Sequence, residues 1–456
     1  MNQYDVVVCG GGTAGMMAAI ASARSGANTL LIERDGYLGG TATYGLPMLG
    51  FFSGDGNKVV GGLPQEIVDR MVSLGGCMGH SRGGTWKTSS GEYNYDFSLT
   101  SYDPEILKIA AQEMALEAGV SILFQTVVIG AQTKDRYISS VELMTVEGRR
   151  NLTARVFIDA TGDAGLTWTA GFPTERRGEG KMQNVTNIIR VGNVDAERMV
   201  KSLMEEGVIK GLRDWHIRLL RGKLLDGGEG YLFLAGHAEI WEDEEPVTFT
   251  GTCWRKEEMA FNITRTVGVD PTLAEDINRA EINERKNINA VMKGLRERIP
   301  GCEKAYLISS CPRVGIREGR RIRGMYTLTE QEVLGRSEFP DGIARGAYPI
   351  DIHDPKGGRT QFSFIKEGGS YAIPYRCLIP EWSRNLLVAG RCVSTTGKAL
   401  GSVRLIPCCM ALGQAAGTAA AFIVKDDVAP AELNTEILRN KLLEDKAILT
   451  VQASQN

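Results

Sequence analysis

The sequence has few histidines and almost no net charge. Among 456 residues there are 4 histidines, and 52 basic residues oppose 55 acidic ones, which gives a net charge of −3. A chain so close to neutral has no global field that would attract nucleic acid or an anionic membrane. The densest basic cluster contains Glu318 and no interleaved aromatic residue, so we interpret it as a solvated or ion-paired face rather than an RNA site. Its arginines are Arg313, Arg317, Arg320, Arg321 and Arg323.

The nine cysteines show neither the spacing of a metal site nor that of a disulfide framework. The only adjacent pair is Cys408-Cys409, and an odd count without a framework predicts reduced thiols and a cytoplasmic protein. The apolar stretch 6–23 is broken by glycines and has no basic region before it, which favours a nucleotide-binding unit over a signal peptide or membrane span. We therefore expect no metal, no membrane and no nucleic acid as partners.

The clearest motif is the glycine run VVVCGGGTAG at residues 6–15. A short strand at 6–8 leads into the spacing GxGxxG, and a helix follows at 16–24. In such units the first glycine makes a tight turn, the second lets a pyrophosphate approach the backbone, and the third lets helix and strand pack closely. The helix N-terminus adds free N–H groups and a partial positive charge. The run predicts a dinucleotide site that includes Gly10, Gly12, Thr13, Ala14 and Gly15.

A carboxylate follows the next predicted strand. Residues 29–32 have the apolar pattern of a buried strand, and Glu33 comes directly after them. An acid at this place in the dinucleotide fingerprint accepts hydrogen bonds from the adenosine ribose. The alternative for Glu33 is a solvated charge at a strand end. We assign Glu33 and the neighbouring Arg34 to the cofactor site.

The remaining pattern predicts two kinds of region. The predicted elements are helices at 64–74, 104–118, 274–298 and 410–423, and strands at 121–128, 137–145, 154–159, 247–253 and 385–389. Asp103 is the expected N-cap of its helix, with a proline just inside. We predict an α/β fold in which a Rossmann-like dinucleotide-binding domain is built from residues 1–167 and 349–456. An α+β substrate domain, 168–348, is inserted between them.

Five motifs occur in order along the chain. They are VVVCGGGTAG, LLIERDGYLGGTAT, IDATGDAG, PRVGIREGRRIRG and IPYRCLIPEWSRNLLVAGRCVSTTGKALGSVRLIPCCMALGQAAGTAAA. Together they resemble the family of FAD-dependent oxidoreductases related to the flavoprotein subunits of fumarate reductase and succinate dehydrogenase. The resemblance covers nearly the whole chain. It implies a glutathione-reductase-like FAD-binding domain and FAD as the cofactor.

The length of FAD supports the same cofactor independently. Besides the first fingerprint, FAD needs a glycine-rich loop near its centre, a distant strand turn beside its ribityl chain and a helix N-terminus near its ring. The segments GYLGGTA, ATGD and the last helix can supply these, whereas NAD would need no such clasp and no second GxGxxG follows a strand. Noncovalent binding is expected because no histidine occurs at 36–62. The further predicted cofactor contacts are Gly39, Gly40, Thr41, Ala42, Val128, Ala160, Thr161, Gly162, Asp163, Gly390, Arg391, Pro407 and Cys408.

Two residues are catalytic candidates. His353 lies in a polar, glycine-bounded loop, and a reference pKa of about 6.5 suits a proton shuttle. Its alternative is a structural histidine bonded to a neighbouring aspartate. Arg404 precedes the last helix as an arginine does in the related fumarate reductases, where it grips a substrate carboxylate. The chain departs from those relatives at Ile406 and Pro407, where they have glycines and asparagine, so Arg404 can instead bind the cofactor or an internal carboxylate.

We therefore expect an FAD-dependent dehydrogenase or reductase that transfers a hydride between a small organic molecule and noncovalent FAD. Tyr375 and Arg376 are further candidates for the pocket, and an unidentified electron donor or acceptor completes the cycle. Two alternatives stay open. One is a flavin monooxygenase that consumes NAD(P)H and oxygen, and the other is an electron-relay subunit without a substrate pocket, which the long middle block disfavours.

Overall fold

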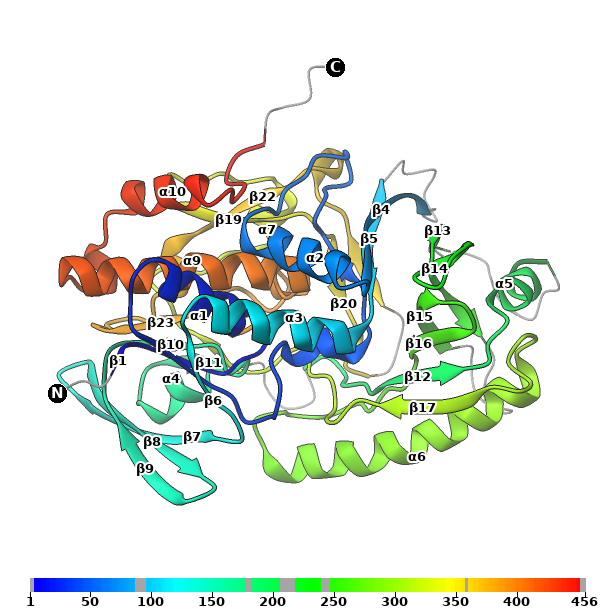
Figure 1. Ribbon diagram of the computed structural model, residues 1–456, viewed down its shortest axis with the longest axis horizontal. Coiled ribbons are helices and arrows are strands. Elements are labelled where there is room, and N and C mark those ends of the chain that lie inside the picture. Colours follow the sequence, from blue (N-terminus) through cyan, green and yellow to red (C-terminus); the bar gives the residue numbers. More distant parts are fainter. Residues whose placement is uncertain are drawn as a thin grey trace.

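The computed structural model describes residues 4–86, 96–176, 182–205, 218–238, 247–356 and 360–451. Two sheets of different kinds form its two halves (Figure 1). A five-stranded parallel sheet lies on the side of the N-terminus, and a nine-stranded antiparallel sheet lies towards the other end of the long axis. The candidate site lies between these halves.

The parallel sheet has the strand order β23-β10-β1-β2-β6, and all of its pairings are parallel. Its strands are β1 Tyr4–Cys9, β2 Thr29–Ile32, β6 Ser121–Leu123, β10 Ala154–Asp159 and β23 Leu386–Val388. The first four come from the N-terminal part of the chain, whereas β23 comes from the C-terminal part. The predicted α/β, Rossmann-like class is confirmed, and the two ends of the chain meet in one sheet.

Both faces of this sheet are covered, as parallel sheets require. Because strand side chains alternate, Val6 and Val8 pack with the helices on one face, while Val7 and Cys9 pack with a small antiparallel sheet on the other. That small sheet consists of β7 Val127–Lys134, β8 Tyr137–Thr145 and β9 Gly148–Leu152. The predicted strand 121–128 is therefore divided, because Gln125 adopts a left-handed φ of 50° between β6 and β7.

Two helices far apart in sequence form the helical layer. α1 (Thr13–Arg24) follows β1, and α9 (Ile406–Asp426) packs directly against it. A Cβ atom on Gly413 would collide with the Ala14 carbonyl oxygen, and one on Gly417 with that of Ala18, so only glycine permits this approach. α9 is long and apolar enough to cross a membrane, but 89% of its most apolar window is buried. It is a core helix.

The antiparallel sheet has the order β17-β12-β16-β15-β14-β13-β4-β5-β3. Its strands are β3 Met48–Leu49, β4 Cys77–Trp86, β5 Phe97–Tyr102, β12 Ile188–Gly192, β13 Arg218–Lys223, β14 Glu229–Ala238, β15 Val247–Arg255, β16 Glu258–Asn262 and β17 Tyr306–Ser310. β3, β4 and β5 fall within the predicted first cofactor segment, yet they join this sheet where β4 pairs with β13. The sheet thus draws on both sides of the predicted limit at residue 168, and the domain limits stay predictions.

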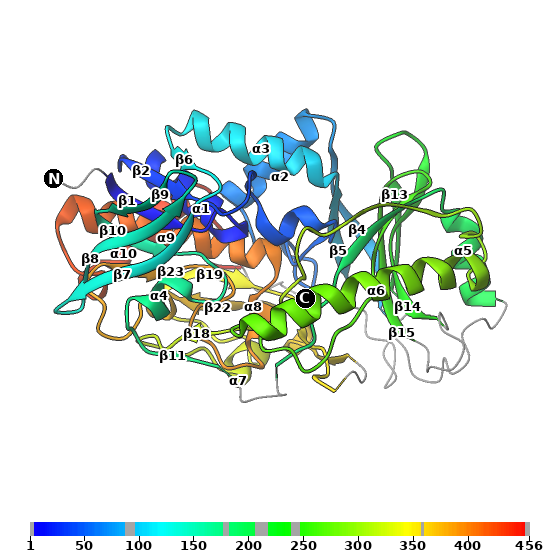
Figure 2. The ribbon, with the colours of Figure 1, turned by 90° about the horizontal axis from the view of Figure 1, so that it is seen from below.

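The helix α6, Ala274–Arg298, has the predicted bounds and runs along the antiparallel sheet (Figures 1 and 2). Ile288, Val291 and Leu295 of α6 share a core with strand residues such as Ile189 and Phe261.

The remaining helices and strands are short or lie outside the two large sheets. They are η1 Gly40–Tyr44, α2 Leu63–Ser73, α3 Pro104–Glu117, α4 Gly165–Thr169, β11 Thr174–Glu175, α5 Ala196–Glu205, β18 Arg321–Ile322, α7 Glu330–Leu334, β19 Gly342–Gly346, β20 Ile350–Ile352, β21 Gln361–Ser363, η2 Lys366–Gly368, β22 Tyr371–Pro374, η3 Tyr375–Leu378, α8 Leu400–Val403, η4 Pro430–Glu432 and α10 Thr435–Glu444. The predicted cap of α3 is confirmed, since the Asp103 carboxylate accepts the Glu105 N–H at 3.0 Å.

Candidate functional site

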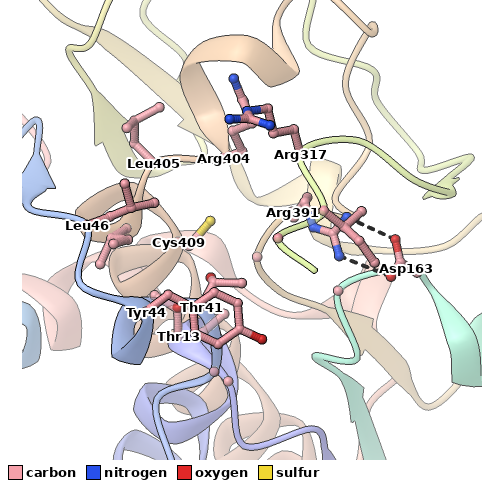
Figure 3. Close-up of a pocket in the computed structure, with 18 of the residues that line it drawn as sticks. Thr13, Thr41, Tyr44, Leu46, Asp163, Arg317, Arg391, Arg404, Leu405 and Cys409 are labelled. Carbon is pink, nitrogen blue, oxygen red and sulfur yellow. Dashed lines mark hydrogen bonds and ion pairs between the residues drawn. The ribbon is translucent and has the colours of Figure 1, made fainter. Parts of the chain in front are cut away.

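A cavity of about 610 Å³ lies between the two halves (Figure 3). The parallel sheet presents its glycine turns to the cavity, and β12, β14, β15 and β16 of the antiparallel sheet form the facing wall. Most predicted site residues line it: Gly10, Gly12, Thr13, Ala14, Glu33, Arg34, Gly40, Thr41, Val128, Ala160, Thr161, Gly162, Asp163, Gly390, Arg391, His353 and Arg404. Residues from both ends of the chain and from the middle block therefore meet at one place.

Five predicted cofactor contacts do not line the cavity. They are Gly15, Gly39, Ala42, Pro407 and Cys408. Gly15 instead packs against the Gly10 carbonyl, and Gly39 takes a φ of 108° while its N–H binds the Gly11 carbonyl. Ala42 and Cys408 are core residues. These positions shape the backbone of the site. Sequence alone could not distinguish residues with this role from residues that contact the cofactor.

The first glycine turn leaves room for an anion at the start of α1. Gly10 has a φ of 103°, which places β1 and α1 at a tight turn. If Gly12 carried a Cβ atom, the nearest atom to it would be the Gly40 Cα at 3.9 Å. The backbone at Gly12 is therefore open towards the cavity. α1 has no acidic residue in its first turn, and its first N–H groups have no intrahelical acceptors. The geometry of the turn therefore suits the binding of an anion.

Glu33 points back towards this turn. Its two carboxylate oxygens accept the N–H of Gly11 at 2.6 Å and that of Asp35 at 2.8 Å. Burial raises the pKa of Glu33, and these two hydrogen bonds oppose the rise. Both oxygens keep further lone pairs for a ligand's hydroxyl groups. The alternative of a solvated strand-end charge is wrong, because only 6% of Glu33 is exposed.

The segment ATGD is held by a buried carboxylate. Asp159 accepts hydrogen bonds from the backbone and hydroxyl of Thr161 and from those of Thr167, all between 2.7 and 3.1 Å. Asp163 then pairs with Arg391 at 3.0 Å, which ties this turn to the loop after β23 (Figure 3). Arg391 therefore supports the cavity wall while also lining it.

The residues at the N-terminus of α9 that line the cavity differ from those predicted. Leu405, Ile406 and Cys409 line the cavity, whereas Pro407 and Cys408 face elsewhere. The Cys409 thiol donates to the Val403 carbonyl at 3.6 Å, and burial raises its pKa to about 12. Its sulfur points into the cavity (Figure 3). This thiol is neutral at physiological pH.

On the facing wall, two arginines share one amide oxygen. Asn262 Oδ1 accepts hydrogen bonds from Arg265 Nη1 at 3.1 Å and from Arg317 Nη2 at 3.3 Å. Arg317 Nη1 also binds the Asn184 carbonyl at 2.8 Å. Burial lowers the pKa of Arg265 to about 10 and that of Arg317 well below its usual value, to which the neighbouring arginines add. These guanidiniums are held together on the wall of the cavity.

The basic cluster is ion-paired, as one of the two expectations had it, but it is not a solvated face: Arg323 pairs with Glu381 at the surface, whereas other members are buried. Arg317 and Arg321 are buried, and Arg313, Arg317 and Arg320 line the cavity. Arg321 pairs with the buried Glu318 at 3.2 Å, and Arg313 pairs with Asp35. Composition does not reveal which of these arginines are buried, because their acceptors lie far away in the sequence.

The two catalytic candidates lie together, beside the paired arginines. Arg404 Nη2 donates to the Asp351 carbonyl at 2.9 Å, and its buried Nε has no hydrogen-bond partner among the described residues. Asp351 Oδ1 lies 3.5 Å from His353 Nε2, and Thr360 Oγ1 lies 3.2 Å from His353 Nδ1. Burial lowers the pKa of Arg404, while Asp351 opposes this change. The group combines an orphaned cationic donor with a histidine and carboxylate.

Other candidates differ from expectation. Tyr375 is buried in the main core with its hydroxyl on the Pro430 carbonyl, and Arg376 pairs with Asp341 at 2.9 Å, so neither lines the cavity. Sequence reasoning missed Asn262, which is the last residue of β16, and Arg265, which follows shortly after that strand. The one available signal was the segment FNITR, in which these two polar residues occur at the end of an otherwise apolar strand.

Comparisons with individual known proteins give only partial or distant similarities. An 80-residue segment is 44% identical to the tRNA uridine 5-carboxymethylaminomethyl modification enzyme MnmG of Bacillus subtilis, and it spans 17% of this chain and 11% of that protein. A geranylgeranyl bacteriochlorophyll reductase-like protein of Thermoplasma acidophilum aligns over 98% of this chain and 85% of its own, at 13% identity and a TM-score of 0.47. The p-nitrophenol 4-monooxygenase of Pseudomonas putida aligns over 96% of this chain and 84% of its own, at 12% identity and a TM-score of 0.49. Similarities this weak say nothing about substrate.

The family itself is shown by the chain as a whole. Residues 5–442 match the model of the family described as FAD dependent oxidoreductase. That range includes both glycine turns, the arginine wall and α9. The cofactor is FAD, and the chain is an enzyme of the FAD dependent oxidoreductase family.

Proposed function

We propose that this enzyme transfers a hydride between noncovalently bound FAD and a small organic acid. The observation that carries the proposal is the placement of Arg404, with its unpartnered Nε, beside His353 and Asp351 on the same cavity as the glycine turns. An anion-binding group and a proton-handling group are what hydride transfer to or from an organic acid requires of the protein.

The residues of the cavity fit FAD. The open position at Gly12 and the free N–H groups of α1 would hold the pyrophosphate, and Glu33 would accept the ribose hydroxyls. α9 also has no acidic residue in its first turn, so its N-terminus suits the electron-rich part of the flavin ring. When bound, FAD supplies a two-electron carrier.

Arg404 would bind and orient the substrate carboxylate. Its Nη2 is fixed by the Asp351 carbonyl, which leaves Nε as a donor of fixed direction. A buried donor without a partner costs about 1–3 kcal/mol, so a ligand that supplies the acceptor recovers this energy. A relation to the fumarate reductase flavoproteins is part of this proposal, and both the five sequence motifs and the arginine before α9 support it.

His353 would move the proton that accompanies the hydride. Its Nδ1 lies beside the Thr360 hydroxyl, and Asp351 Oδ1 lies on the Nε2 side of the ring. Asp351 can therefore hold the imidazole in one orientation and stabilise its protonated form. A separate electron donor or acceptor would restore the flavin after each turnover.

The deciding experiment is anaerobic titration of the purified holoprotein with pools of small organic acids, followed by the visible absorbance of the flavin. We expect at least one pool to bleach the flavin, or to reoxidise it after chemical reduction. If oxygen consumption with NAD(P)H is the only activity, the enzyme is a monooxygenase and the proposal is wrong. If no small molecule exchanges electrons with the flavin, the electron-relay alternative replaces it.

A further inference from the structure

A short segment connects the antiparallel half with both sides of the first glycine turn. Residues 313–320, which we call the arginine strap, lie between β17 and β18. In the parallel sheet, β1 lies between β2 and β10. One end of the strap contacts the loop after β2, and the other contacts the turn after β10. The strap therefore crosses the edge of the sheet at which β1 leads into the glycine turn, and both line the same cavity.

The backbone of the strap is attached to the antiparallel half. The Val314 N–H donates to Glu281 of α6 at 2.8 Å, and Val314 packs with Ala280 of the same helix. Gly315 exchanges two backbone hydrogen bonds with Thr186, which precedes β12. The strap thus belongs to the half that faces the glycine turn across the cavity.

At the first end of the strap, Arg313 pairs with Asp35. The Asp35 N–H is one of the two donors that hold the Glu33 carboxylate, at 2.8 Å. Arg313 also lines the cavity, and its Nε is buried without a hydrogen-bond partner among the described residues. A buried donor of this kind is costly unless a ligand supplies the acceptor.

At the second end, the strap lies directly against Asp163. A Cβ atom on Gly319 would collide with the Asp163 carboxylate, which Arg391 holds in place. Arg320 Nε donates to the Asp163 carbonyl at 3.1 Å, and its guanidinium lies over Trp168, 5.1 Å from the ring centroid. Because Arg391 takes the Asp163 carboxylate, Arg320 forms no ion pair with a carboxylate among the described residues.

Two guanidiniums therefore approach the cofactor end of the cavity from the half that faces the glycine turn. The turn and α1 offer backbone N–H groups, which contact an anion from one side. A dinucleotide has two linked phosphates, both negatively charged, whose oxygens also point away from that turn. Guanidinium groups suit such oxygens because they donate several N–H groups in one plane.

We propose that the arginine strap is a second cofactor-binding element, in which Arg313 and Arg320 bind the pyrophosphate of FAD from the side opposite the glycine turn. The pyrophosphate is then enclosed between backbone donors and guanidinium donors, and FAD leaves only after the arginine contacts break. The proposal concerns the cofactor alone and holds for any substrate and either direction of hydride transfer.

Exchange of bound FAD for added radiolabelled FAD tests the proposal in the intact holoprotein without turnover. We would compare the exchange rates of Arg313→Met and Arg320→Met with that of the wild type. Methionine keeps much of the apolar length of the side chain but removes the guanidinium. We expect each variant to exchange FAD roughly tenfold to a hundredfold faster, the range for loss of one hydrogen bond to a charged group.

Arg323→Met is the matched control. Arg323 belongs to the same basic cluster, but it follows the strap, does not line the cavity and pairs with Glu381 at 3.2 Å. Its variant should exchange FAD at the wild-type rate. The proposal is wrong unless both strap variants accelerate exchange and the control does not.

Phosphorus NMR of the bound FAD separates contact with the phosphates from a general loosening of the fold. Both strap variants should shift the pyrophosphate resonances, and Arg323→Met should leave them in place. Faster exchange with unshifted resonances overturns the proposal, because FAD would then escape for another reason. Where a methionine variant does not fold, Arg313→Lys and Arg320→Lys keep the charge and replace it. Their pyrophosphate resonances should also shift, and unshifted resonances again contradict the proposal.

Discussion

The two walls of the cavity recognise their ligands by different means. The wall towards the parallel sheet uses backbone: glycine turns, a helix N-terminus and one carboxylate fixed by N–H groups. The facing wall uses side chains from separate strands and loops, with Asn262 holding Arg265 and Arg317 together. Backbone recognition leaves a local pattern in the sequence, whereas side-chain recognition depends on how distant segments meet. The predictions below separate these two modes.

The largest effect is expected where the backbone wall is assembled. Gly413→Val places a side chain into the Ala14 carbonyl and forces α9 away from α1. We expect loss of FAD and a destabilisation of at least about 3 kcal/mol, since overpacking at helix backbones allows little relaxation. FAD content and thermal unfolding measure this. Gly26→Ala is the control. The added Cβ would meet no atom within 4 Å, so only the left-handed backbone conformation at this position should lower the stability, by roughly 1–2 kcal/mol.

A change on the side-chain wall should spare the cofactor and remove turnover. His353→Gln keeps a polar side chain beside Asp351 and Thr360 but cannot carry a proton at neutral pH. The turnover number should fall about 10²- to 10⁴-fold, which is the usual contribution of a general acid or base. The FAD content should match that of the wild type. A variant that retains its turnover would make His353 a structural residue.

Glu33→Gln tests the carboxylate that is held by the first glycine turn of the backbone wall. Gln cannot accept both the Gly11 and Asp35 N–H groups, so FAD affinity should fall by about tenfold. Because burial raises the Glu33 pKa, the ionised carboxylate destabilises the FAD-free protein, and this cost disappears as the pH falls through that raised pKa. FAD-free wild type should therefore gain stability relative to the variant on acidification. Thermal unfolding as a function of pH measures the difference, and a constant difference contradicts this reading.

The smallest effect compares the two adjacent cysteines. Cys408→Ser buries a hydroxyl in the core and should cost about 1–3 kcal/mol while leaving FAD affinity unchanged. Cys409→Ser lies at the cavity and should change the flavin spectrum; its loss of stability should be smaller because the serine hydroxyl can donate to the Val403 carbonyl, as the thiol does. The opposite assignment of these two effects would mean that the first turn of α9 is rotated by one residue.

Sequence reasoning succeeded where structure is local. It identified β2, β8, β10 and α6 with their bounds, and it found the FAD fingerprint, because strand alternation, glycine spacing and caps act within a few residues. It missed the split at Gln125, where an isolated left-handed residue interrupts an apolar run. It also failed to predict that β3, β4 and β5 join the distant antiparallel sheet, since strand pairing across the chain has no local signature.

The site followed the same division. The sequence predicted Arg404 and His353 as two separate catalytic candidates. It did not predict that both lie beside Asp351, which only the folded structure shows. Arg317 stood in a quoted motif, yet its local composition indicated a surface. Burial of a guanidinium depends on acceptors such as the Asn184 carbonyl and Asn262, which lie far away in the sequence.

The close packing of α9 on α1 also has a consequence for biosynthesis. α1 leaves the ribosome early, but the helix that completes its face is made only after the whole antiparallel sheet. At the usual rate of about 5–20 residues per second, the nascent chain waits on the order of tens of seconds between the two events. During this interval the surface of α1 that packs on α9 has no native partner. Flavin loading should consequently be a late step, and nascent chains that stop before α9 should depend on chaperones.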